Sequence, residues 1–111
     1  MNKQSIIEIS EFYGFDAQSR QCIEEMAELT VALNKLWRTK QSEINYQEEI
    51  VKRRYDAIFM KQKSETVEEI ADVYIMLEQM KYLLNIYEDD IETIINRKIL
   101  RQLERINNGL E

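Results

Sequence analysis

The sequence predicts an all-α protein, a helical bundle of about four to five helices. Its 111 residues include no proline and only two glycines, Gly14 and Gly109, so few positions interrupt a helix. About 44% of the residues are apolar and 32% are charged, which is typical of a folded helical protein and not of a disordered chain. The length suits one domain, residues 1–111, built around one hydrophobic core.

The first half of the chain is expected to form three helices. The first covers about residues 3–13 and ends at Gly14, and the second follows Asp16, a plausible N-cap, and ends near Arg38. Residues 39–47 are expected to connect the second helix to a third, which has the sequence EEIVKRRYDAIFMK and offers apolar side chains for packing.

Two more helices are expected in the second half. Ser64 or Thr66 would cap a fourth helix that ends near Asn85. A fifth covers about residues 88–107; it is acidic at its start and basic toward its end, as the helix dipole favours. Gly109 is expected to close this last helix.

Composition narrows the classes of function. There is no histidine, which excludes Ser-His-Asp triads, Cys-His pairs and histidine-based zinc sites. The single cysteine, Cys22, falls on an apolar helical stripe and is expected to be a small buried hydrophobe and not a reactive thiol. A net charge of −6 makes nucleic acid and anionic membranes poor partners. No apolar run approaches the roughly 20 residues that span a bilayer, and no signal peptide is evident, so we expect a cytoplasmic protein.

Two of the predicted helices carry carboxylates spaced three residues apart. The stretch CIEEMAEL places Glu25 and Glu28 on the second helix, and TVEEIADVYIMLEQM places Glu69 and Asp72 on the fourth. At about 100° per residue, Glu69 projects into the apolar stripe of its helix and Asp72 lies at the border of that stripe. Glu25 shares an arc with apolar residues of the second helix.

Carboxylates on apolar stripes need a positive partner. A buried unpaired carboxylate costs several kcal/mol or becomes neutral, and acids brought together repel one another. No arginine lies in register with each acid, so a divalent cation between the two helices would explain the arrangement. Oxygen ligands without histidine or cysteine favour Mg²⁺, with Mn²⁺ as the other possibility.

A surface explanation stays open beside the metal explanation. Glutamate-rich helices are common, and Thr66 with Glu69 could form a capping box. The doublet Glu48–Glu49 serves as an internal comparison, because Glu49 can pair with Arg53 one turn later on a solvated face.

The order of the acidic motifs resembles a known signature. EEMAE at residues 24–28 followed by EIAD at residues 69–72 is similar to the EExxE…ExxD pattern of the all-α nucleoside triphosphate pyrophosphohydrolases. This superfamily includes the MazG proteins, the dimeric dUTPases and the helical dCTP pyrophosphatases. Gln18 precedes the first motif, as a glutamine often does there, and KILRQLERI resembles the basic tail of small members. The gap between the motifs is long, so residues 41–64 could be an insertion, and the absence of a dUTPase-specific motif leaves the base preference open.

The resemblance implies a fold and a reaction. It implies a MazG-like helical bundle that a second subunit completes, and a Mg²⁺-dependent hydrolysis of a (deoxy)nucleoside triphosphate to the monophosphate and pyrophosphate by a metal-activated water. Glu24 is the candidate for orienting or deprotonating that water, or for binding a further ion. The implied metal ligands are Glu25, Glu28, Glu69 and Asp72.

Substrate contacts are expected from cations and one aromatic residue. Lys98 and Arg101 on the last helix could contact a triphosphate, although ordinary charge at the end of a helix explains them equally well. Trp37 could stack on a base, but its position near other apolar residues fits core packing better. The candidate substrate-binding residues are Gln18, Lys35, Trp37, Arg38, Lys98 and Arg101.

Apolar stripes on nearly every helix also predict a homodimer or homotetramer. Two alternatives to the pyrophosphohydrolase remain. One is a non-catalytic helical interaction protein with an acidic surface, and the other is a phosphohydrolase that acts on another diphosphate-linked metabolite.

Overall fold

The computed structural model describes residues 1–42 and 48–109, and this part of the chain is helical without strands. It contains α1 (Lys3–Ser42), α2 (Glu49–Leu83) and α3 (Glu88–Asn107). The all-α prediction is therefore confirmed, and the predicted limits of the last helix agree with α3. The second predicted helix continues past Arg38 to Ser42, and the rest of the predicted connection, residues 43–47, lies outside the described residues.

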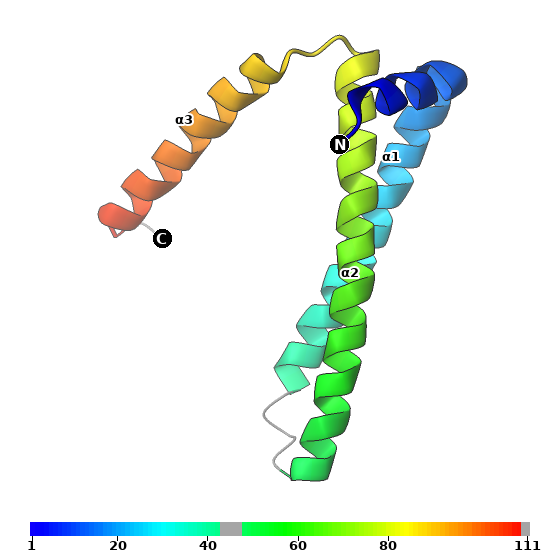
Figure 1. The fold of residues 1–111 in the computed structure, drawn as a ribbon. Coiled ribbons are helices and arrows are strands. Elements are labelled where there is room, and N and C mark those ends of the chain that lie inside the picture. Colours follow the sequence, from blue (N-terminus) through cyan, green and yellow to red (C-terminus); the bar gives the residue numbers. More distant parts are fainter. Residues whose placement is uncertain (43–47, 110–111) are drawn as a thin grey trace.

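Gly14 divides α1 into two parts, as the sequence predicts. Its φ of 81° and ψ of 171° are not helical, and the positive φ is costly for a residue with a Cβ atom. The chain bends there, so the short first part of α1 crosses the C-terminal end of α2, while the long second part runs beside α2 (Figure 1).

The prediction of separate third and fourth helices is wrong, because α2 is continuous from Glu49 to Leu83. Thr66 is buried within it, and its hydroxyl donates to the carbonyl of Gln62, at 2.8 Å, instead of capping a new helix. No glycine or proline occurs in this stretch, and a serine or threonine inside a helix costs only a few tenths of a kcal/mol. Burial of Tyr55 and Val73 at either end of the stretch outweighs that cost.

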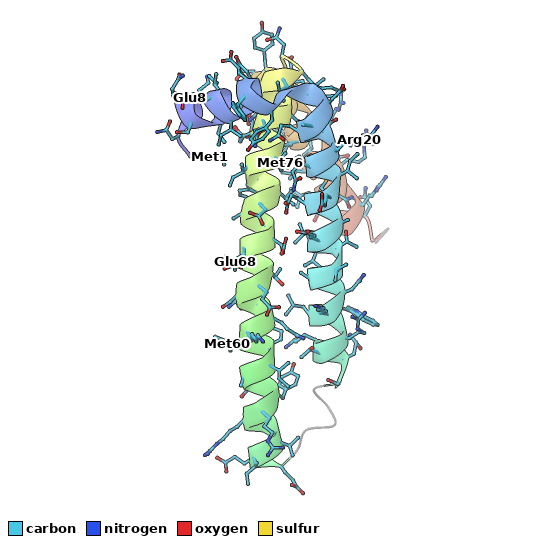
Figure 2. The ribbon with its side chains drawn as sticks, turned by 90° about the vertical axis from the view of Figure 1, so that its right-hand side faces the viewer. Met1, Glu8, Arg20, Met60, Glu68 and Met76 are labelled. Carbon is cyan, nitrogen blue, oxygen red and sulfur yellow. The ribbon has the colours of Figure 1, made fainter. Side chains whose placement is uncertain are left out.

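The long part of α1 and α2 form an antiparallel helical hairpin (Figure 1), and side chains of the two helices meet between the ribbons (Figure 2). The buried apolar side chains are few and are spread along the hairpin: Ile6, Cys22, Tyr55, Val73 and Met76. Cys22 is buried as predicted, and this burial raises the pKa of its thiol. Gln18 and Gln79 are also buried, and they contact each other across the hairpin.

The third helix leaves the hairpin and projects away from it (Figure 1). Asn85, the residue after the C-cap Leu84 of α2, has a φ of 55°. The next amide, Ile86 N–H, donates to the carbonyl of Lys81 at 2.8 Å, as in a Schellman motif. The Lys81 ammonium pairs with Glu78 and with Glu88 at the start of α3. Along α3, six large apolar side chains are exposed in the single chain: Ile94, Ile95, Ile99, Leu100, Leu103 and Ile106.

None of the helices in the described ranges has the length and apolar character needed to cross a membrane.

Candidate metal centre

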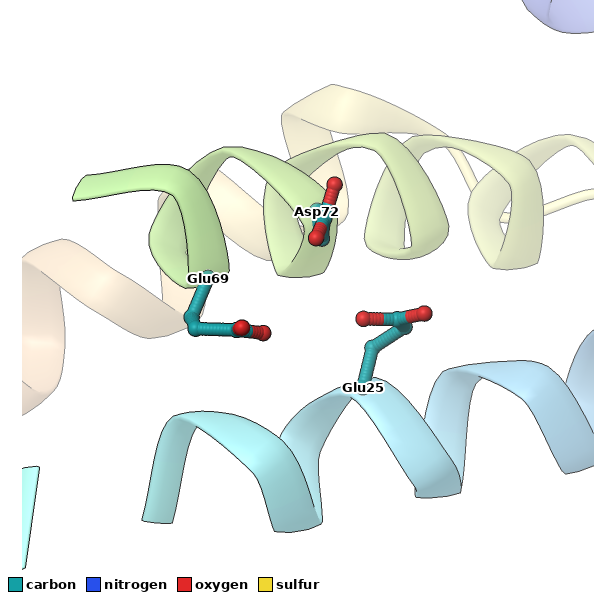
Figure 3. Close-up of side chains that lie close together, drawn as sticks. All are labelled: Glu25, Glu69 and Asp72. Atoms are coloured by element: carbon teal, nitrogen blue, oxygen red, sulfur yellow. The ribbon is translucent and has the colours of Figure 1, made fainter. Parts of the chain in front are cut away.

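Three of the predicted metal ligands converge between the two hairpin helices. Figure 3 shows Glu25 extending from α1 toward α2, and Glu69 and Asp72 extending from successive turns of α2. One carboxylate oxygen from each residue lies within 4.8 Å of the others, and we call these three residues the acidic cluster. The i, i+3 spacing places Glu69 and Asp72 on one side of α2, and the antiparallel packing brings Glu25 opposite them.

The acidic cluster has two carboxylate oxygens without a hydrogen-bond partner. One oxygen of Glu25, Oε1, accepts a hydrogen bond of 2.7 Å from the Gln21 side-chain amide. The other oxygen, Oε2, is buried and has no partner, and the same holds for Oε2 of Glu69. Both side chains are half-buried, so water replaces these missing bonds only in part.

Charge repulsion is concentrated at this level of the hairpin. The pKa of Glu28 is raised above its usual value, first by the negative charge of Glu25, then by desolvation and by the charges of Glu69 and Glu24. Glu28 itself is exposed and lies at the edge of the acidic cluster, so it can approach the cluster from the solvent side.

These features match what a divalent cation requires. The site offers oxygen ligands from two helices, two of the oxygens lack a donor, and no lysine or arginine pairs with Glu25, Glu69 or Asp72 among the ion pairs of the described residues. Hard cations such as Mg²⁺ and Mn²⁺ take ligands of this kind. The acidic cluster, with Glu28 beside it, could therefore hold such an ion.

A pocket of about 420 Å³ adjoins the acidic cluster, and we call it the acidic pocket. Ala27, Val31 and Ala32 supply its apolar surface, and its acidic lining residues are Glu24, Glu28, Glu65, Glu68 and Glu69. Glu24 therefore lies beside the cluster without belonging to it, a position from which it could act on a molecule bound in the pocket.

A second pocket, of about 470 Å³, lies farther along the hairpin, and we call it the basic pocket. Its cations are Lys35 and Arg38 from α1 and Lys61 from α2. Lys35 also lines the acidic pocket, so the two pockets are neighbours. None of the three cations forms an ion pair within the described part of the chain. Charge thus changes from negative to positive along one side of the hairpin.

Other predicted substrate residues lie elsewhere. Lys98 and Arg101 are on α3, which projects away from the hairpin (Figure 1). No residue of α3 lines the acidic pocket or the basic pocket. Gln18 is buried at 7% exposure, and its amide donates to Gln79, so it faces the hairpin interior instead of a pocket. Trp37 is 63% exposed, which contradicts the expectation that it packs in the core of this chain.

Two residues of the hairpin were not singled out from the sequence: Lys61 in the basic pocket and the buried Gln79. Lys61 lies on α2, which the sequence was expected to divide into two separate helices, so its position next to Lys35 was not predicted. Gln79 was overlooked because it falls at the border of the apolar stripe, about 40° from Leu83 on a helical wheel, and its partner Gln18 is far away in the sequence.

Comparison with protein-family models, with curated proteins and with solved structures finds no match for this chain. The function is therefore inferred from the acidic cluster, from the pockets beside it and from the resemblance of the two acidic motifs.

Proposed function

We propose that this protein is a Mg²⁺-dependent nucleoside triphosphate pyrophosphohydrolase of the all-α, MazG-like class. The observation that carries the proposal is the meeting of Glu25, Glu69 and Asp72 across the hairpin, with two buried carboxylate oxygens left without a donor. All three belong to the EExxE…ExxD pattern. Bringing these carboxylates together raises their mutual repulsion, and a divalent cation between the helices would offset it.

In the proposed reaction, Glu25, Glu69 and Asp72 hold the cation, and Glu28 completes the ligand set from the edge. The bound ion supplies neutralisation of phosphate oxygens and a lowered pKa for water. Glu24, lining the acidic pocket, orients the attacking water and accepts its proton. The water oxygen bonds to the α-phosphorus, the bond from that phosphorus to the α–β bridging oxygen breaks, and the monophosphate and pyrophosphate leave.

We place the far phosphates of the substrate in the basic pocket. Lys35, Arg38 and Lys61 offer three positive charges close to a metal site that is itself acidic, and a polyanion needs such groups to offset the repulsion from the carboxylates. Trp37, exposed on the same stretch of α1, is the candidate for stacking on the base. Lys98 and Arg101 would reach a substrate only from a second copy of the chain.

We also propose that the working protein is a homodimer or homotetramer. The accessible surface of the single chain is 8989 Å², whereas a compact protein of this mass exposes about 6,500 Å². The excess of roughly 2,500 Å² is comparable to the surface buried in a permanent subunit interface. The exposed apolar side chains of α3 are part of this excess, so a second copy that covers them would complete the bundle. Light scattering coupled to size exclusion tests this, and a monomer at micromolar concentration would contradict it.

The uncovered apolar surface also favours the second candidate function, a non-catalytic helical interaction protein. One experiment separates the two candidates. Purified protein is incubated with Mg²⁺ and each of the eight common NTPs and dNTPs, and pyrophosphate release is measured against a Glu69→Ala variant. Release above that variant with at least one nucleotide supports the enzyme. Equal signals for both proteins across all eight nucleotides would refute it.

A further inference from the structure

The buried contact between Gln18 and Gln79 lies at a fixed spacing from the acidic cluster. The Gln18 side-chain amide donates to Oε1 of Gln79 at 2.7 Å, and Gln79 is only 2% exposed. Glu25 follows Gln18 by seven residues on α1, and Asp72 precedes Gln79 by seven residues on α2. Seven residues are about two helical turns, so in each helix the glutamine and the carboxylate share one face.

The antiparallel packing turns these two spacings into one geometric relation. Moving two turns along α1 from Gln18 and two turns back along α2 from Gln79 leads to the same level of the hairpin, where Glu25 meets Asp72. The axial register that pairs the two glutamines is therefore the register that assembles the acidic cluster. A slip of one residue would displace the opposing carboxylates by about 1.5 Å and rotate one of them away.

Apolar packing alone defines this register weakly. The buried apolar side chains of the hairpin are small in number, and an apolar contact tolerates sliding because it has no direction. Repulsion among the carboxylates favours moving them apart. A buried amide pair opposes sliding, because each amide loses its partner in any other register and desolvated amides are costly to leave unpaired. A single buried polar contact sets the register of helix pairs in this way.

We propose that Gln18 and Gln79 are positioning residues that fix the register of α1 on α2 and thereby hold the metal ligands together. The part of this proposal that concerns metal rests on the proposed function, whereas the part that concerns register does not. Gln18 acts through Glu25, and Gln79 acts through Asp72, so neither amide needs to contact the metal or the substrate.

The test uses Gln18→Met combined with Gln79→Met, which keeps the side-chain length and removes both amides together. Replacing both partners by apolar groups of similar shape leaves little cost in stability, so this variant should fold. The matched control is Ser10→Ala. Ser10 is fully buried, and its hydroxyl donates to the carbonyl of Ile6 in the same helix, so this change removes a buried hydrogen bond without touching the register.

Two measurements are made on each full-length protein. The first is the affinity for Mn²⁺ by calorimetry, where the double variant is expected to bind at least tenfold more weakly and Ser10→Ala as well as the wild type. The second is the distance between spin labels at the exposed positions Arg20 and Lys63, which this register separates by about fourteen residues along the hairpin axis, so that a slip changes the distance directly; Cys22→Ala is the background. The double variant should give a shifted or broadened distribution, by one residue rise or more.

The two measurements separate the proposals. If the wild type binds no Mn²⁺, the proposed function fails and the label distances alone decide the register. An unchanged distance distribution in the double variant overturns the register proposal whatever the metal result. A changed distribution with unchanged Mn²⁺ affinity overturns the claim that the two amides position the ligands.

Discussion

Replacing Glu69 by glutamine should raise the stability of the metal-free protein and lower that of the metal-bound protein. Glu69→Gln removes one charge from the acidic cluster, where its carboxylate lies within 4.8 Å of two others. At that distance one charge pair costs about 0.9 kcal/mol with the dielectric constant of water and about 3.5 kcal/mol at an effective value near 20. Glu25 and Glu69 are half-buried and Asp72 is exposed, so we take a figure near the lower limit.

Removing two such pairs should stabilise the metal-free Glu69→Gln variant by about 2 kcal/mol, and salt screens part of this gain. For a domain of this size we expect the melting temperature of Glu69→Gln in a chelator to exceed that of the wild type by about 4 °C or more. Saturating cation, at about a hundred times its dissociation constant, stabilises the wild type by about 2.7 kcal/mol and should stabilise the variant much less. The order of the two melting temperatures therefore reverses between chelator and Mg²⁺ or Mn²⁺.

Thermal melts by circular dichroism at one protomer concentration measure both conditions. Glu49→Gln is the matched control, because Glu49 is exposed and pairs at 2.9 Å with Arg53 on the same helix, and cation should affect it as it affects the wild type. The reasoning is refuted if Glu69→Gln is no more stable than the wild type in chelator. It is refuted equally if added cation leaves the wild-type melt unchanged.

Three further outcomes are expected. The pKa of Glu28 is raised above its usual 4.5, so the folded state holds that proton more tightly than the unfolded state. In chelator, the stability that this proton contributes is present below pH 4.5 and is lost as the pH rises through the raised pKa. Glu28→Gln should flatten that part of a series of denaturation measurements against pH. Lys61→Ala should weaken the binding of inorganic tripolyphosphate with Mg²⁺ about tenfold, as measured by calorimetry. Lys63→Ala is the control, because Lys63 is an exposed cation on the same helix outside the basic pocket and its loss should not weaken binding. Equal losses in the two variants would show that Lys61 is not part of the site. Trp37 is the one tryptophan, so its emission should change when a nucleoside triphosphate binds and stay constant with tripolyphosphate, and a constant emission with both at saturation would exclude base stacking there.

The limits of a helix were predictable where one residue or one turn of the helix determines them. Gly14 marks a break because its left-handed φ is a property of one residue, and the acidic start of α3 marks a helix start through the dipole. The predicted break at Ser64 or Thr66 failed for the opposite reason. Both residues suit a cap in isolation, but here Thr66 bonds to its own helix at Gln62, and burial along α1 decides the outcome.

The faces of the carboxylates were also predictable, because the position of a side chain on one helix follows from the helical period. The expected arc of Glu25 and the expected stripe of Glu69 agree with their half-buried side chains. For Trp37 the helical period gives the direction of the side chain but not its burial. A wheel places it beside apolar neighbours, but whether that face is covered depends on a second helix or a second copy of the chain, and in this hairpin α2 does not cover it.

Convergence of the acidic cluster could not be derived from either helix alone. A wheel gives the direction of each carboxylate and leaves the axial offset between the helices free, so Glu25 could face any turn of α2. The offset depends on contacts that pair residues far apart in the sequence, such as Gln18 with Gln79, sixty-one positions away. Only when that offset is correct do the repelling charges of Glu25 and Asp72 share a level, where a cation can lie between them. A polar contact remote from the carboxylates therefore determines whether two acidic helices form a metal site or a repelling surface.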